Sequence, residues 1–186
     1  MKLETARLVL RPWQERDRAP YIRINADPVV RRFYPDLNTP ETTSGWIDRY
    51  IRKWHEDGIS FFVVERKSDG AFIGDVGVSR LDYPVPGDPE FEIGWLTDSR
   101  FWGRGYAPEA AHASLDFAWK TVPRLPEIVA FTSRRNHPSR RVMEKIGMVR
   151  DPARDFEHPK VPPGHPLGPH VLYSIANPGK PVHRRA

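Results

Sequence analysis

The chain of 186 residues contains no cysteine and no long apolar run. The lack of cysteine excludes disulfides, zinc–thiolate sites, iron–sulfur clusters and cysteine nucleophiles. No stretch approaches the ~20 apolar residues that a membrane-spanning helix needs. The N-terminal segment also lacks the apolar core of a secretion signal, because Arg7 and Arg11 bracket its only apolar run. We therefore expect a cytoplasmic protein without a membrane partner.

The chain carries only a small excess of positive charge. The chain has 29 Lys and Arg against 24 Asp and Glu, a formal net charge of +5, and its basic residues are spread along the sequence. This excess suits a phosphorylated ligand or an acidic partner. No nucleic-acid-binding motif accompanies it, so we expect no nucleic-acid partner. The seven histidines form no metal-ligating pair at helical spacing, and we expect no metal.

Proline is abundant, with 20 residues, and eight of these follow residue 150. The C-terminal part is therefore expected to be rich in loops. The length corresponds to one domain at roughly 100–200 residues per domain. We find no internal repeat and no Gly/Ser linker, and we assign residues 1–176 to a single domain and residues 177–186 to a short tail.

Hydrophobic periodicity and turn residues predict a mixed α/β domain built around one sheet. Thr39 and Pro40 are suited to begin a helix, and Gly58 to end it. Gly74 and Gly77 indicate a bulge or a close backbone approach within a strand. Strands are expected at residues 8–11, 60–66, 72–81, 90–96, 127–132, from 148 and at 171–175, and helices at 15–25, 40–58, 108–120 and 138–146.

The most informative segment is a glycine-containing loop between a strand and a helix. Gly103 and Gly105 have no Cβ atom that would keep a pyrophosphate away from the backbone, and Arg104 adds a charge between them. The helix is expected to open at Ala107–Pro108, where free N–H groups form an anion site. A dinucleotide fingerprint would need glycine at Pro108 and is excluded. A tight turn without a ligand is the alternative.

A second helix start lies farther along the chain, at Asn136 and Ser139. In a β–α–β–α unit the N-termini of both helices can emerge on the same side of the sheet. An extended ligand would then lie between them. For Asn136, a capping role is the alternative to ligand contact.

Taken together, these segments resemble the GCN5-related N-acetyltransferases (GNAT), and within them the RimJ/RimL-like branch. The resemblance covers nearly the whole chain. It rests on the segments TARLVLRPWQERD (residues 5–17), NADP (25–28), EIGW (92–95), WGRGYAPEA (102–110), Asn136-x-x-Ser139 followed by MEKIGM (143–148), DFEHP (155–159) and HVLYSI (170–175).

The resemblance implies the GNAT fold, a mostly antiparallel mixed sheet with a splayed central strand, and acetyl-CoA as acyl donor. In this family a β-bulge in the central strand opens a gap for pantetheine. Here that strand is the segment at 92–96, and the backbone of Trp95 and Leu96 would pair with the pantetheine amides. The pyrophosphate loop would comprise Trp102, Gly103, Arg104, Gly105, Tyr106 and Ala107, followed at the second helix by Asn136 and Ser139.

The register of this loop rests on where the helix starts. The family's pyrophosphate motif is Arg or Gln, two residues, Gly, one residue, then Gly or Ala. When its last residue is placed at the helix start, the motif aligns with Trp102, Gly105 and Ala107. Trp102 then stands where Arg or Gln is usual. A register that begins at Arg100 also fits by eye, but it puts the helix two residues too late.

The chemistry of the resemblance requires a base and, for the leaving thiolate, a proton donor. Glu92 is the candidate base, because it lies on the strand face opposite Phe91, Ile93 and Trp95. A surface or ion-paired glutamate is the alternative. Ser139 is the candidate acid, since Met143 occupies the position of the family's usual tyrosine. Tyr173 and bulk water are alternatives.

The expected activity is direct transfer of acetyl from acetyl-CoA to a primary amine in a ternary complex, without a covalent enzyme intermediate. The amine is a protein N-terminus or a small molecule, and the enzyme is a monomer or a homodimer. His158 and His170 are candidates for one wall of the acceptor site, and residues 31–34 for the opposite wall. The alternative is an acyl-CoA-binding module without turnover, such as a sensor.

Overall fold

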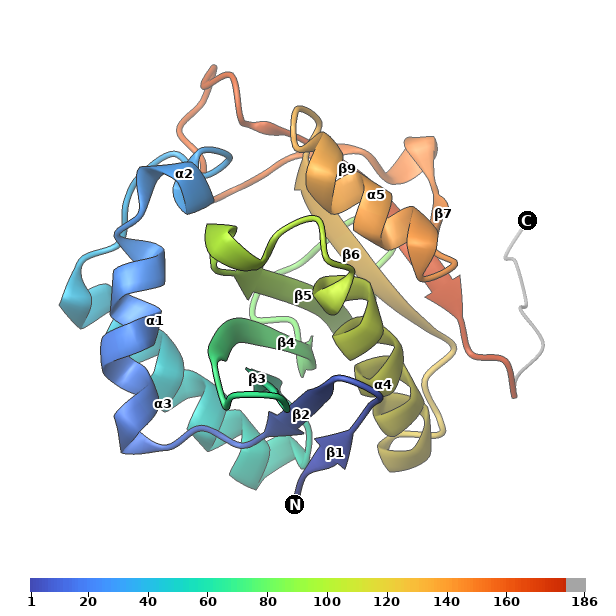
Figure 1. The fold of residues 1–186 in the computed structure, drawn as a ribbon. Coiled ribbons are helices and arrows are strands. Elements are labelled where there is room, and N and C mark those ends of the chain that lie inside the picture. The colour runs from blue at the N-terminus through green and yellow to red at the C-terminus, as the bar shows by residue number, and fades with distance from the viewer. Residues whose placement is uncertain (180–186) are drawn as a thin grey trace.

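The computed structural model describes residues 1–179, and these form one mixed sheet flanked by helices (Figure 1). The strand order is β1-β2-β3-β4-β5-β6-β9-β7, and β8 pairs with β9. The strands are β1 (Leu3–Glu4), β2 (Leu8–Arg11), β3 (Phe61–Arg66), β4 (Phe72–Arg80), β5 (Phe91–Thr97), β6 (Glu127–Ser133), β7 (Val149–Arg150), β8 (Phe156–Glu157) and β9 (Pro169–Ala176). The helices are α1 (Arg18–Asn25), α2 (Pro28–Arg31), α3 (Pro40–Asp57), α4 (Tyr106–Thr121) and α5 (His137–Lys145), with short 3-10 turns η1 (Glu15–Asp17), η2 (Ser99–Phe101) and η3 (Pro152–Arg154).

The splayed strand predicted from the sequence is β5. Its parallel pairing with β6 consists of the single pair Glu92↔Val129, whereas β6 pairs with β9 in antiparallel register along its whole length. The expected bulge in β5 is absent, because the β4–β5 ladder runs without a register shift from Arg80↔Phe91 to Gly74↔Thr97. The two halves of the sheet therefore separate because β6 follows β9 rather than β5.

The glycines of β4 are required by close packing within the sheet. A Cβ atom on Gly77 would lie 2.4 Å from the Cα of Phe61, and one on Gly74 would lie 2.1 Å from the carbonyl oxygen of Leu96. The β3–β4 register also shifts between Val64 and Glu65, next to Gly74. Both alternatives predicted for these glycines, a close approach and a bulge, thus occur in β4.

Helix ends follow the capping residues with two differences from expectation. Thr39 accepts a hydrogen bond from the Thr42 amide at 3.2 Å, and Gly58 ends α3 in the left-handed conformation. Helix α1 ends at Asn25, as predicted, and the Asp27 side chain caps the start of the short helix α2, which was not predicted. Helix α4 begins at Tyr106, one residue before the expected start, because Gly105 serves as its N-cap.

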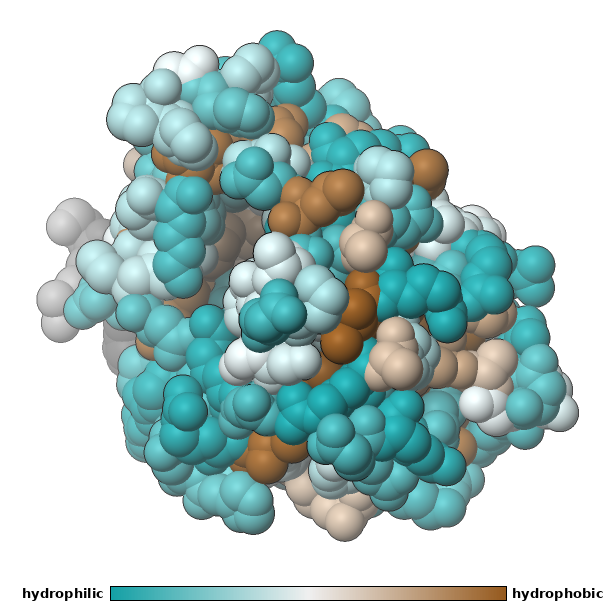
Figure 2. Space-filling view, turned by 90° about the vertical axis from the view of Figure 1, so that its left-hand side faces the viewer, coloured by the Kyte–Doolittle hydropathy of each residue, from teal (hydrophilic) through white to brown (hydrophobic). Residues whose placement is uncertain are grey.

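The two faces of the sheet are covered by different helices. Helices α1 and α3 pack on one face over a cluster of aromatic rings, in which Trp13 and Tyr21 lie 4.8 Å apart, as do Tyr50 and Phe61. Helix α4 packs on the other face through the fully buried Ala110 and Ala111. The outer side of the α1–α3 layer is mostly hydrophilic, with apolar groups in small separate areas (Figure 2).

The predicted tail begins with an ordered contact. Asn177 is buried and donates from Nδ2 to the carbonyl oxygen of Leu125 at 3.0 Å. The remainder of the predicted tail, residues 180–186, lies outside the described residues. Within residues 1–179, none of the helices is both long and apolar enough to span a membrane.

Candidate active site

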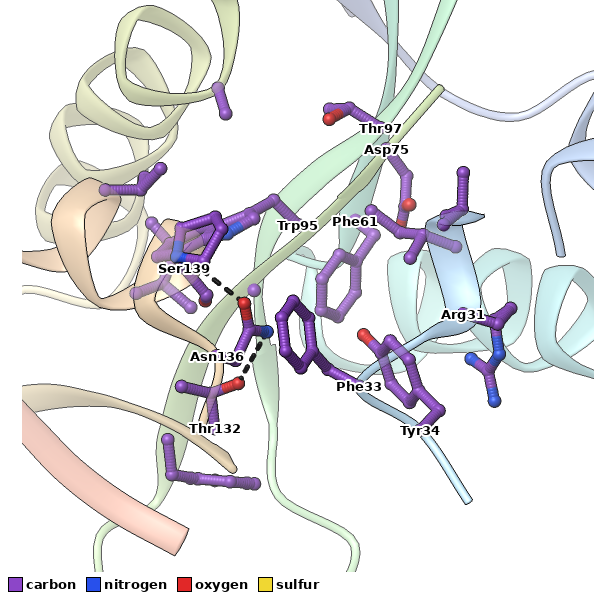
Figure 3. Close-up of a pocket in the computed structure, with 18 of the residues that line it drawn as sticks. Arg31, Phe33, Tyr34, Phe61, Asp75, Trp95, Thr97, Thr132, Asn136 and Ser139 are labelled. Carbon is purple, nitrogen blue, oxygen red and sulfur yellow. Dashed lines mark hydrogen bonds between the residues drawn. The ribbon is translucent and has the colours of Figure 1, made fainter. Parts of the chain in front are cut away.

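A cavity of about 770 Å³ is lined by residues of both β5 and β6, where the two strands separate. Its other walls come from residues 31–36, the glycine loop, the start of α5 and the late loop near His158. Figure 3 shows Ser139 and Asn136 on one side of this space, Arg31 and Tyr34 on the other, and Phe33 and Phe61 between them. The sheet topology thus brings together segments that lie far apart in the sequence.

The glycine loop has the geometry of an anion-binding site. Gly103 and Gly105 have φ angles of 76° and 77°, a left-handed conformation that favours glycine. The amides of residues 103–107 have no hydrogen-bond acceptor among the described residues, and Gly105 caps the helix that follows. Five free N–H groups at a helix start attract negative charge, as a pyrophosphate requires.

The loop is held in place by the N-terminal segment of the chain. Arg7 donates from Nη1 to the carbonyl oxygen of Arg104 at 2.9 Å, and its guanidinium pairs with Glu109 of α4 at 2.6 Å. Thr5 donates its hydroxyl hydrogen to the same carboxylate at 2.6 Å. Sequence reasoning did not assign Arg7 to the site, because the residues that it joins are about a hundred positions away.

Two loop residues differ from expectation in what they contribute. The side chain of Arg104 is exposed and does not line the cavity, so only its backbone takes part in the loop structure. The indole of Trp102 donates to the Thr97 carbonyl oxygen at 2.9 Å, and the guanidinium of Arg32 lies 5.0 Å from its ring centre. The cations that line the cavity include Arg32, which the sequence placed in the acceptor wall, and Arg141 and Lys145, which it did not assign to the site.

The other predicted cofactor residues all line the cavity, namely Trp95, Leu96, Trp102, Gly103, Gly105, Tyr106, Ala107, Asn136 and Ser139. The strand separation and the free loop amides therefore offer an extended cleft with a phosphate-binding end. These are the features that a pantetheine arm with a pyrophosphate requires, and the residues present fit such a group.

Asn136 acts as the cap of α5. Its Oδ1 accepts from the Ser139 amide at 3.2 Å, and its Nδ2 donates to Thr132 Oγ1 at 3.0 Å (Figure 3). The hydroxyl of Ser139 makes no hydrogen bond with any other described residue, and this side chain faces the cavity. Tyr173, the alternative acid, does not line the cavity, and its hydroxyl donates to Glu144 and accepts from Arg140.

Glu92 lies on the β5 face that carries Gly94 and Leu96, opposite Phe91, Ile93 and Trp95. Burial raises the pKa of its carboxyl group to about 7, although the nearby positive charges of Lys53 and Arg49 act in the opposite direction. Within residues 1–179 no cation lies within 4.0 Å of this carboxylate, so the ion-paired alternative is not what the structure contains. A carboxyl group with this pKa can accept a proton near neutral pH.

Near His158 the cavity wall includes Tyr83, and the tautomer of the histidine decides whether the Tyr83 hydroxyl donates or accepts a hydrogen bond. The Lys160 amide donates to His158 Nδ1 at 3.2 Å, and burial lowers the pKa of this imidazole to about 4, so the neutral ring carries its proton on Nε2. Nε2 therefore donates to the Tyr83 hydroxyl oxygen at 2.9 Å. The hydrogen of the Tyr83 hydroxyl is left for another acceptor at the cavity, which His170 also lines.

Asp75 of β4 was not predicted as a site residue, yet it lines the same cavity. Only 2% of its surface is exposed, and burial raises the pKa of its carboxyl group to about 7. Its Oδ1 has no hydrogen-bond partner among the described residues. The only sequence signal was an acidic residue within an otherwise apolar strand segment, FIGDVGV.

Comparison with known proteins agrees with this geometry. Residues 7–149 match the acetyltransferase (GNAT) domain family. The uncharacterised protein YkkB of Bacillus subtilis is 34% identical over 148 residues, which cover 79% of this chain and 84% of that protein. A solved acetyltransferase from Agrobacterium tumefaciens is 31% identical with a TM-score of 0.76, and the match covers 94% of each chain.

A ribosomal-protein-S5-alanine acetyltransferase from Vibrio fischeri shares the fold at 22% identity. Its TM-score is 0.70, and the match covers 97% of this chain and all of that one. The matched family domain spans the anion-binding loop, the separated strands and the start of α5. The chain therefore belongs to the GNAT family and is an acetyl-CoA-dependent acetyltransferase.

Proposed function

We propose that this enzyme acetylates a primary amine, by direct attack of the amine on acetyl-CoA within a ternary complex. When bound, acetyl-CoA supplies an acetyl thioester, from which a neutral amine forms an amide while CoA leaves as the thiol. The observation that carries the proposal is the position of Glu92 at the single β5–β6 pair, where the cavity begins. Its carboxyl group has the pKa that proton removal from an ammonium acceptor requires.

The residues of the chain divide the work between the two ends of the cavity. The free amides of the glycine loop bind the pyrophosphate, and Arg141 and Lys145 add positive charge beside it. The β5 backbone around Trp95 and Leu96 faces the gap left by β6 and orients the pantetheine. Glu92 removes the amine proton, and the Ser139 hydroxyl donates a proton to the leaving sulfur.

The RimJ/RimL-like branch remains the finer assignment that we propose. The Vibrio fischeri neighbour in that group supports the fold, and the acceptor of this enzyme is either a protein N-terminal amine or a small-molecule amine. We propose residues 1–176 as one catalytic domain that acts as a monomer or homodimer. The cytoplasmic location stays a prediction.

The first test is calorimetric titration of the purified protein with acetyl-CoA, alongside Gly105→Glu. This variant puts a side chain and a negative charge where the loop amides bind, so we expect it to lose binding. The matched control is Gly70→Glu, which also replaces a glycine with positive φ but lies in the β3–β4 turn. Equal affinity in both variants would contradict the placement of the pyrophosphate.

Acetyl transfer is then measured as release of free thiol with a panel of primary amines. We expect turnover in the wild type and a loss of about 100-fold in Glu92→Gln, because general base catalysis contributes about 10²–10⁴-fold. A protein that binds acetyl-CoA tightly but releases no thiol with any amine or peptide would instead be the non-catalytic sensor that the sequence left as an alternative.

A further inference from the structure

The wall of the cavity contains a buried carboxyl group that the proposed chemistry does not use. Asp75 is 2% exposed, its Oδ1 has no hydrogen-bond partner, and it forms no ion pair within residues 1–179. A buried carboxylate without a counter-charge is unfavourable, so such groups are normally paired with a cation or bind a ligand. In Figure 3 the Asp75 side chain points from β4 toward the space that Phe61 and Tyr34 border.

The surroundings of Asp75 favour a cation. Aromatic rings of Tyr21, Tyr50 and Phe61 line the same part of the cavity, and the Tyr50 and Phe61 rings lie 4.8 Å apart. Aromatic faces attract positive charge, and the hydrogen bond between Tyr21 and Asp75 favours the ionised carboxylate. An ammonium group would therefore supply the charge that the carboxylate lacks.

The register of the sheet fixes the relation of Asp75 to Glu92. Asp75 pairs with Leu96 and Ser79 pairs with Glu92, so both acids lie on one face, four residues apart along the ladder. At roughly 3.3 Å per residue the two positions are about 13 Å apart.

The surface between these two acids is apolar. The Gly77↔Gly94 pair lies midway between them, and neither residue has a side chain. The Phe61 ring covers this gap, since a Cβ atom on Gly94 would lie 3.1 Å from its Cε1 atom. The face therefore presents a carboxyl group, an aromatic ring and a second carboxyl group in sequence.

We propose that the acceptor is a long-chain α,ω-diamine. One amine is acetylated at Glu92, the alkyl chain crosses the Phe61 ring, and the second amine stays protonated and is held by Asp75. This inference rests on the proposed amine acetylation and narrows its acceptor. Only the first amine forms a bond to acetyl and gives up its proton, while the contact at Asp75 is an ion pair.

The activity test compares 1,8-diaminooctane with n-octylamine and 1,3-diaminopropane, with thiol release as the readout. We expect kcat/KM for 1,8-diaminooctane to exceed that for the other two at least tenfold, because only this probe has a second ammonium at the required distance. In Asp75→Asn the advantage over n-octylamine should disappear, with the n-octylamine value unchanged within about twofold. Equal values for the three amines in the wild type would overturn the proposal.

A binding test separates this inference from the proposed function. Calorimetric titration of 1,8-diaminooctane into protein saturated with CoA requires no acetyl transfer. We expect Asp75→Asn to raise the Kd at least tenfold, whereas Asp116→Asn, which removes an exposed charge on α4 outside the cavity, should leave it unchanged. Absence of diamine binding in the wild type, or equal Kd values in the two variants, would overturn the diamine site.

The two proposals can thus fail independently. Diamine binding that depends on Asp75, without thiol release, would support the site and contradict the acetylation. Turnover with n-octylamine and no preference for the diamine would support the acetylation and contradict the diamine site. Should Asp75→Asn fail to fold, Asp75→Ser provides the same comparison with a smaller side chain.

Discussion

The guanidinium of Arg7 donates to the carbonyl oxygen of Arg104 at 2.9 Å and so ties the N-terminal segment to the anion-binding loop. The same guanidinium pairs with Glu109 in the first turn of α4. Arg7 therefore fixes the loop relative to the helix start without using a loop amide. This arrangement leaves the amides of residues 103–107 without an acceptor among the described residues, as the proposed binding of a pyrophosphate requires.

Removal of this contact should weaken cofactor binding more than folding. We expect Arg7→Ala to raise the Kd for acetyl-CoA about tenfold, because the loop amides are no longer held together before binding. The loss of stability should stay at about 1 kcal/mol or less, since Arg7 is partly exposed. Calorimetry and thermal melting measure the two effects. Arg16→Ala, at an exposed arginine that pairs with Glu65, is the control, and an equal Kd in both variants would contradict this role.

The rate should depend on pH through Glu92. Burial raises the pKa of Glu92 to about 7, and its ionised form is the base, so kcat/KM in the wild type should fall as the pH drops below about 7. In Glu92→Gln this fall of kcat/KM at low pH should be absent, so that only the titration of the amine at higher pH remains. The control is Glu90→Gln, because ion pairs with Arg124 and Arg80 lower the pKa of this exposed neighbour. If kcat/KM of Glu92→Gln still fell below about pH 7, another residue would have to be the base.

Tyr83 should affect the acceptor and not the cofactor. Its hydroxyl accepts from His158 and has its own hydrogen available at the cavity wall. We expect Tyr83→Phe to raise the KM of the amine about fivefold, a loss within the usual range for one hydrogen bond, with the Kd of acetyl-CoA unchanged. Tyr173→Phe removes a hydroxyl that bonds to Glu144 away from the cavity, and it should leave the amine KM unchanged. A change in acetyl-CoA affinity in Tyr83→Phe would argue against this division.

Asp75 should lower the stability of the ligand-free protein at neutral and alkaline pH. Its pKa is raised to about 7 in the folded state from about 3.8, so the folded protein retains a proton that the unfolded chain releases. The destabilisation is therefore absent below pH 4, grows as the pH rises to about 7 and is constant above it. We expect Asp75→Asn to be more stable than the wild type by about 1–3 kcal/mol at pH 8.

Denaturant unfolding at several pH values measures this difference. The stability gap between Asp75→Asn and the wild type should widen between pH 4 and pH 7. Glu90→Gln again provides the control, since the pKa of Glu90 is lowered rather than raised. A variant that is less stable than the wild type at pH 8 would show that the Asp75 carboxylate is stabilised by a contact within the protein.

Much of the fold could be predicted from the sequence, because the limits of many elements depend on neighbouring residues. The limits of β2 and α3 were predicted closely, because strand alternation, Thr39, Pro40 and Gly58 act within a few residues. The glycine loop was predicted for the same reason, since a left-handed backbone and a helix start both depend on adjacent positions. The very short strands β1 and β8 were missed, because each is defined by its partner strand rather than by its own pattern.

The amino-acid sequence by itself determined the family and the glycine loop, because the left-handed backbone and the helix start depend on adjacent residues. The roles of Glu92 as base and Ser139 as acid stay predictions. Only the tertiary structure decided which side chains are paired and which are not. Arg7 contacts Glu109 across 102 residues, and the tautomer of His158 follows from its neighbours in three dimensions. The lack of a counter-charge at Asp75 within residues 1–179 could not be predicted from the sequence either, because it depends on every element packed against this carboxyl group.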